Sequence, residues 1–138
     1  MKLSASVATL AVLIGAFQAS VADTPEASAE AAAQTWLGLV DAGDFAKSWD
    51  TSSRYFRNSV PQSQWASQVS AVRGPLGAVK SRRIASAKFA RSLPGAPDGE
   101  YVVITFSTSF EHKAEATETV TPVKDPDGQW RVSGYFVR

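Results

Sequence analysis

The side chains that most often carry out catalysis or bind transition metals are scarce in this sequence. Among its 138 residues there is no cysteine, and His112 is the only histidine. His112 falls in a predicted hairpin turn beside Glu111 and Lys113, whereas a general base or a metal ligand needs partners that converge in a pocket. We therefore expect His112 to be exposed and inert, and we expect no catalytic residue of this kind, no metal site and no cofactor.

Glu118 and Thr108 are the residues whose positions point most clearly to a site. Strand periodicity and turn spacing place both on the face of a predicted sheet that packs against helices. A carboxylate there loses hydration, so it must find a cation or a donor, or hold a proton. Such a group could act as a general base or anchor a polar ligand. The alternative, which is commoner, is a structural ion pair between Glu118 and one of three arginines, Arg73, Arg82 or Arg83.

Tyr55 and Arg73 complete the set of candidate ligand-binding residues. Tyr55 lies in the segment Arg54–Arg57, which could form the lip of a cavity and attract an anion, although a solvated linker with one buried aromatic residue is the default interpretation. The tryptophans fall on apolar stripes, where large aromatic side chains fill gaps between helix and sheet. We therefore expect them to pack in the core rather than to stack on a ligand.

Three helices are expected in the first half of the chain. The first covers residues 25–42 after the cap Thr24, and its apolar residues recur with helical spacing. A short second helix follows the cap Asp44. The third opens at Ser59–Gln62, which has the spacing of a capping box, and it stops at Gly74.

The second half of the chain is rich in β-branched and aromatic residues separated by turn sequences. Three helices followed by four strands in hairpin succession predict an α+β fold, with the helices on one face of an antiparallel sheet. Residues 23–138 then form a single domain. The expected strands cover residues 82–93, 100–110, 117–124 and 129–138.

Two turns predict the register of the last three strands. Asp125–Gly128 has the residues of a type I turn followed by a left-handed glycine, which places Glu118 opposite Phe136. A three-residue loop at 112–114 places Thr108 opposite Glu118. Phe136 then faces the helices. The polar outer face is expected to carry Tyr135 together with Thr117, Thr119 and Thr121.

Residues 1–22 have the features of a secretory signal peptide. Lys2 comes before an apolar run over 7–17, and small residues then predict cleavage between Ala22 and Asp23. We expect an exported protein, periplasmic or secreted, without a stable membrane anchor after cleavage; an uncleaved N-terminal anchor is the alternative. Cleavage would remove one of the 14 basic residues and leave 13 against 13 acidic residues, so nucleic-acid binding is not expected.

Several blocks together resemble the bacterial exported family named domain of unknown function 4019. They are AAQTWLGLVDAGDFAKSWD, VRGPLGAVKSR, LPGAPDGEYVVITF and ETVTPVKDPDGQWRVSGYFVR, and the resemblance covers about Ala32 to Arg138. It implies a cystatin-like or nuclear-transport-factor-2-like α+β cone. It implies no activity, and it supplies no catalytic residues.

The function expected from the sequence is that of an exported binding or protein-interaction module without catalytic activity. The alternative is a small cone-fold enzyme of the isomerase or hydratase type, or a small-ligand binder, that uses Glu118 in a pocket. The fold alone does not decide between these functions. The threonine-rich outer face is compatible with a homodimer and equally with solvent.

Overall fold

The chain folds as helices followed by strands. The computed structural model describes Gly15 and residues 24–138, so most of the predicted signal peptide and its cleavage site, Ala22 and Asp23, lie outside the described residues. In this part of the chain no helix is long and apolar enough to cross a membrane. The elements are α1 (Pro25–Asp41), α2 (Phe45–Asp50), α3 (Arg54–Ser59), α4 (Gln62–Arg73), β1 (Val79–Ala90), β2 (Tyr101–Phe110), β3 (Lys113–Lys124) and β4 (Trp130–Val137).

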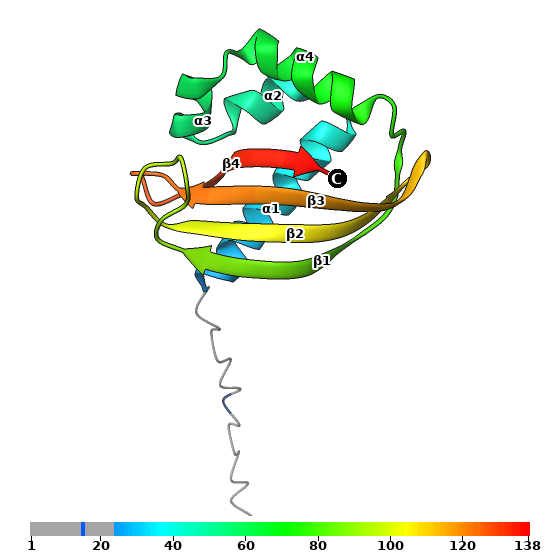
Figure 1. Ribbon diagram of the computed structural model, residues 1–138. Coiled ribbons are helices and arrows are strands. Elements are labelled where there is room, and N and C mark those ends of the chain that lie inside the picture. The colour runs from blue at the N-terminus through cyan, green and yellow to red at the C-terminus, as the bar shows by residue number, and fades with distance from the viewer. Residues whose placement is uncertain (1–14, 16–23) are drawn as a thin grey trace, which may run out of the picture.

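The four strands form one antiparallel sheet in the order β1-β2-β3-β4. Figure 1 shows α1 crossing one face of this sheet, whereas α2, α3 and α4 lie together beside its β4 edge. The core lies between the two layers and includes Leu37 of α1, Ile104 of β2 and Val120 of β3, each 0% exposed. The predicted α+β class is therefore confirmed, and the arrangement is compatible with the expected cone.

The first helix begins and ends close to its predicted bounds. The Thr24 side chain accepts a hydrogen bond from the backbone N–H of Ala27 at 3.1 Å, which satisfies one of the unpaired N–H groups at a helix start. The buried residues of α1 recur with helical spacing and end at Val40. This spacing leaves Asp41, four residues after buried Leu37, at the end of the face that packs on the sheet.

The described residues contain four helices, one more than the three expected from the sequence. Arg54–Ser59 forms α3, and the Ser53 side chain caps it by accepting from the N–H of Phe56 at 3.1 Å. The predicted capping box at Ser59 is wrong, because α4 starts after Pro61 without a side-chain cap. The Ser59 hydroxyl instead donates to the Tyr55 carbonyl oxygen within α3.

A β-bulge in β4 reverses the predicted placement of two aromatic residues. Pro122 pairs with Val132 as expected, but Val120 then pairs with Tyr135, so β4 has one more residue than β3 in this interval. An extra residue changes which side chains point to which face. Tyr135 therefore faces the helices, and Phe136, 47% exposed, lies on the outer face.

The β2–β3 hairpin differs from the prediction by two residues. Its loop is Glu111–His112, and Thr108 pairs with Ala116 rather than with Glu118. Because side chains alternate with a period of two, a shift of two residues leaves the side chains from Tyr101 to Thr108 and from Ala116 to Val123 on their predicted faces. Thr108 and Glu118 are thus diagonal neighbours on the helix-facing side of the sheet.

Candidate functional site

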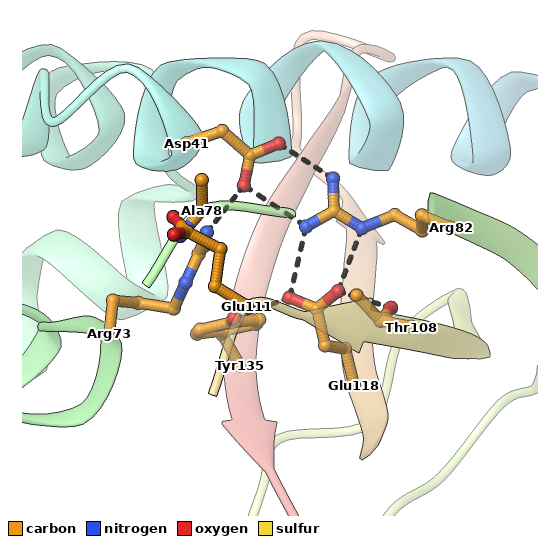
Figure 2. Close-up of polar contacts among 8 residues, drawn as sticks. All are labelled: Asp41, Arg73, Ala78, Arg82, Thr108, Glu111, Glu118 and Tyr135. Atoms are coloured by element: carbon orange, nitrogen blue, oxygen red, sulfur yellow. Dashed lines mark hydrogen bonds and ion pairs between the residues drawn. The ribbon is translucent and has the colours of Figure 1, made fainter. Parts of the chain in front are cut away.

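Glu118 lies on β3 beneath the helices and is 0% exposed. Its Oε1 accepts hydrogen bonds from Arg82 Nε at 2.7 Å and from the Thr108 hydroxyl at 2.6 Å. Its Oε2 accepts from Arg82 Nη2 at 3.2 Å and from the Tyr135 hydroxyl at 2.5 Å (Figure 2). Each oxygen of the carboxylate therefore has two donors, supplied by three different strands.

Asp41 joins two arginines to this arrangement. Arg82 donates to both Asp41 oxygens, at 2.7 and 3.0 Å, and Arg73 Nη2 donates to Asp41 Oδ1 at 2.8 Å. Figure 2 shows Arg82 between the two carboxylates, with Asp41 on the helix above and Glu118 on the sheet below. We call this set the Glu118 cluster; its members are Asp41, Arg73, Arg82, Thr108, Glu118 and Tyr135.

The charges of the Glu118 cluster cancel, and they perturb one another. Burial alone would raise the pKa of Asp41, but hydrogen bonds from Arg82 and Arg73 outweigh burial and lower it. For Arg82, burial opposes the charge, whereas Asp41 and Glu118 favour it, and its pKa is raised. Burial also raises the pKa of Tyr135, and the negative charge of Glu118 adds to this effect. These three shifts favour an ionised Asp41, a charged Arg82 and a neutral Tyr135 phenol.

Arg73 contacts an aromatic ring in addition to forming its ion pair with Asp41. Its guanidinium carbon lies 5.0 Å from the centre of the Phe110 ring, a distance typical of a cation–π contact. The residue is only 8% exposed, and its Nε and Nη1 have no hydrogen-bond partner among the described residues. Arg73 thus carries a buried charge that only Asp41 balances directly.

Access to Glu118 from solvent is closed. A trough of about 540 Å³ crosses β1, β2 and β3 near their ends, and Arg82 and Thr108 are among its lining residues, but Glu118 is not. A molecule in this trough would meet serine and threonine hydroxyls and the exposed side chains of Arg83 and Glu115. The cluster as it stands is suited to holding strands and α1 together, and a substrate would have to displace a donor to reach the carboxylate.

The other candidates from the sequence lie elsewhere. Tyr55 is on α3, 41% exposed, and its hydroxyl donates to the Gly95 carbonyl oxygen at 3.4 Å rather than to the Glu118 cluster. Of the three arginines proposed for Glu118, Arg82 makes the ion pair and Arg73 joins through Asp41, whereas exposed Arg83 does neither. His112 is exposed in the hairpin loop. Among the described residues no group of three His, Asp or Glu side chains is arranged to hold a metal ion.

Two members of the cluster, Asp41 and Tyr135, were not predicted from the sequence. A carboxylate in the last turn of a helix is destabilised by the helix dipole. Asp41 lies there, four residues after the buried residue Leu37, so a nearby cation could be expected. For Tyr135 the signal was Gly134, since a glycine inside a strand often marks a bulge. Both signals were present in the sequence, and each needed the three-dimensional partner to be interpreted.

Comparison with known proteins adds a family and no activity. The family described as "Protein of unknown function (DUF4019)" matches residues 32–135. No curated protein matches the chain. The match includes Asp41, Arg73, Arg82, Thr108, Glu118 and Tyr135.

Proposed function

Since the chain belongs to the DUF4019 family, whose description gives no function, we propose from the geometry of the site that it is an exported binding or protein-interaction module without catalytic activity. The observation that carries this proposal is the saturation of Glu118. A general base needs a free lone pair directed at its substrate. Glu118 is 0% exposed, and each of its oxygens already accepts two hydrogen bonds.

A thermal-shift screen of the mature protein and its Glu118→Gln variant tests this proposal, because a ligand that binds only the folded state raises its stability. The screen uses carboxylic acids, amino acids and sugars as probes. We expect no compound to raise the melting temperature of the wild type alone. A compound that stabilises the wild type but not the variant would overturn the proposal in favour of the cone-fold enzyme or small-ligand binder. Thr108→Val, which removes one donor to Glu118, replaces the first variant if that variant does not fold.

Export is the second part of the proposal, and it rests on the sequence of residues 1–22. We propose cleavage between Ala22 and Asp23 and release into the periplasm or the medium. Intact-mass measurement on protein isolated from cell fractions tests this. The expected species begins at Asp23 and lies in the exported fraction; a chain that keeps residues 1–22 and stays with the cells or their membranes would contradict it.

A homodimer that forms through the outer face of the sheet is the third part of the proposal. Phe136, 47% exposed, adds an apolar side chain to the outer face that carries Thr117 and Thr119. Sedimentation of the mature protein at high micromolar concentration measures its mass. A strict monomer would end this proposal, and a dimer that Phe136→Ser dissociates would support it.

A further inference from the structure

Trp130 differs from the other tryptophans in the environment of its indole N–H. The indole groups of Trp36, Trp49 and Trp65 each donate to an oxygen of the protein, at distances between 2.6 and 3.1 Å. Trp130 is half-buried, and its indole N–H has no hydrogen-bond partner among the described residues. A tryptophan N–H usually finds a partner where the ring is buried. Trp130 therefore has a donor that remains available to a ligand.

Two hollows meet at Trp130. Their volumes are about 390 and 480 Å³, and Ala32, Gln129 and Trp130 line both of them. Small-molecule sites in proteins have volumes of about 300–1,000 Å³. Each hollow is therefore large enough for a small ligand, and the residues that they share make the two positions adjoin.

The hollows exist because α1 contributes small side chains beside the indole. Trp130 begins β4 and packs against the core, as expected from the sequence. From α1, Ser28, Ala31 and Ala32 line the hollows, whereas larger side chains such as Leu37 are buried in the core further along the helix. The helix thus leaves part of the indole uncovered.

Polar side chains without internal partners also line the hollows. The Gln129 amide, next to Trp130, and the hydroxyls of Ser28 and Thr35 make no hydrogen bond to the described residues. An amide has donor N–H groups and an acceptor oxygen, and a hydroxyl both donates and accepts. The rim of the hollows is therefore suited to a ligand that carries both kinds of group.

The charged residues that line the two hollows nearly cancel. Lys124 pairs with Glu100 at 3.8 Å. Arg131 pairs with two aspartates, which together exceed its charge by one. Lys47, on the wall of the larger hollow, supplies one positive charge that no ion pair within the described part of the chain neutralises. The lining thus favours a ligand without net charge.

We propose that Trp130 and the two hollows bind a neutral saccharide of two rings. The inference rests on the proposed role as a binding module and goes beyond it, since it names a ligand class and a site away from the Glu118 cluster. A pyranose ring has an apolar face of C–H groups and a rim of hydroxyls. The face fits the flat apolar surface of the indole, and the hydroxyls fit the free indole N–H and the polar side chains of the rim.

Two other ligand classes fit this site less well. A purely apolar ligand would remove the Gln129 amide and the neighbouring hydroxyls from water without replacing their hydrogen bonds, which costs free energy. A proline-rich peptide docks in a groove lined by aromatic rings, but Trp36, the other aromatic residue that lines the hollows, is only 3% exposed. A saccharide uses both the single accessible indole and the polar rim.

The indole N–H resonances in a nitrogen–proton correlation NMR spectrum of the mature protein test the inference. The probes are maltose, cellobiose and diacetylchitobiose at millimolar concentration, and Trp130→Phe assigns the Trp130 resonance by removing it. We expect at least one disaccharide to shift this resonance, whereas those of Trp49 and Trp65, which line neither hollow, stay unchanged. No shift with any of the disaccharides, or an equal shift of every indole resonance, would overturn the inference. A shift caused by a proline-rich peptide and by none of the disaccharides would overturn it in favour of a peptide site.

Two alanines of α1 supply a matched pair of variants. Ala31 lines the larger hollow and Ala27 lines neither, and both are exposed on the same helix. We expect Ala31→Leu to fill part of the hollow and to bind the disaccharide roughly tenfold more weakly. Ala27→Leu should bind it as the wild type does. Equal affinities of the two variants would contradict the inference.

The Glu118→Gln variant separates this inference from the proposed function. A disaccharide bound at Trp130 should raise the melting temperatures of the wild type and of Glu118→Gln alike. Stabilisation of neither protein, without a shift of the Trp130 resonance, would overturn this inference and leave the proposed function standing. Stabilisation of the wild type alone would overturn the proposed function instead.

Discussion

Arg82 links two carboxylates that come from different layers of the fold. It donates to Asp41 on α1 and to Glu118 on β3, and its side chain is 15% exposed. Removing two charges from water is costly, and their attraction offsets this cost only where the geometry is good and the remaining lone pairs are satisfied. The Glu118 cluster meets both conditions at Glu118. Its ion pairs connect α1 to the sheet, and we expect them to position α1 and to add little net stability beyond that of a well-packed apolar contact.

Arg82 and its neighbour Arg83 form a natural comparison, because adjacent residues of β1 point to opposite faces. We expect Arg82→Gln to lower the free energy of unfolding by about 3–5 kcal/mol, since it leaves two carboxylates without their shared cation. Arg83→Gln on the exposed face should change it by less than about 0.5 kcal/mol. Urea unfolding of both variants measures the difference, and similar losses would contradict the structural role of Arg82.

Tyr135 should make the stability of the protein sensitive to alkaline pH. Burial, and then the charge of Glu118, raise its pKa in the folded state, so folding favours the protonated phenol. The resulting stability is fully present below the pKa of an unfolded tyrosine, about 10, and is lost as the pH rises through that value toward the folded pKa. Urea unfolding between about pH 8 and about pH 11 should show a smaller loss for Tyr135→Phe than for the wild type. The exposed Tyr55→Phe variant should follow the wild type; an unchanged loss in Tyr135→Phe would exclude this explanation.

At the scale of the elements, a single extra residue in β4 determines which aromatic side chain reaches the site. Without the bulge Phe136 would point at the helices and Glu118 would lack its Tyr135 donor. With the bulge the hydroxyl of Tyr135 reaches Glu118, and its ring lies 5.3 Å from that of Trp36. The same bulge places Phe136 on the outer face of the sheet, opposite Thr119. The composition of the candidate site thus depends on one local feature of the strand.

The short helix α3 depends on its cap, and the two serines near its ends test this. Ser53→Ala removes the side chain that accepts from the N–H of Phe56, so we expect a loss of about 1 kcal/mol. Ser59→Ala removes only a hydroxyl that donates back to the Tyr55 carbonyl oxygen within α3, and its effect should stay below about 0.5 kcal/mol. Thermal unfolding compares the two. A larger effect at Ser59 would favour the capping box that the sequence suggests.

For the whole molecule, sequence patterns of a few residues correctly predicted the features that depend on interactions between residues close together in the chain. The α+β class, the caps Thr24 and Asp44 and the buried position of Glu118 follow from periodicity and turn residues, which act over a few positions. The bulge at Gly134 and the two-residue loop before Lys113 do not, because either loop length satisfies the turn residues and only packing selects one. The pairing of Asp41 with β1 likewise requires knowing how α1 crosses the sheet. Sequence therefore identified Glu118 as a charge in need of a partner, and the fold identified Arg82 as the partner.

The last strand ties the two layers together, which makes its removal the broadest test of this structure. A chain that ends at Lys124 loses the Val132 side chain, 2% exposed, the carbonyl group that accepts from Ser53, and the Tyr135 donor to Glu118. β3 would then become an open edge with buried Glu118 and Val120 beside it, so we expect the shortened chain to lack fixed tertiary structure and cooperative melting. Near-ultraviolet circular dichroism and thermal melting measure both properties. A chain that ends at Val137 keeps the strand and should melt cooperatively. If the chain ending at Lys124 also melted cooperatively, the core would close without β4, and this account of the strand would be wrong.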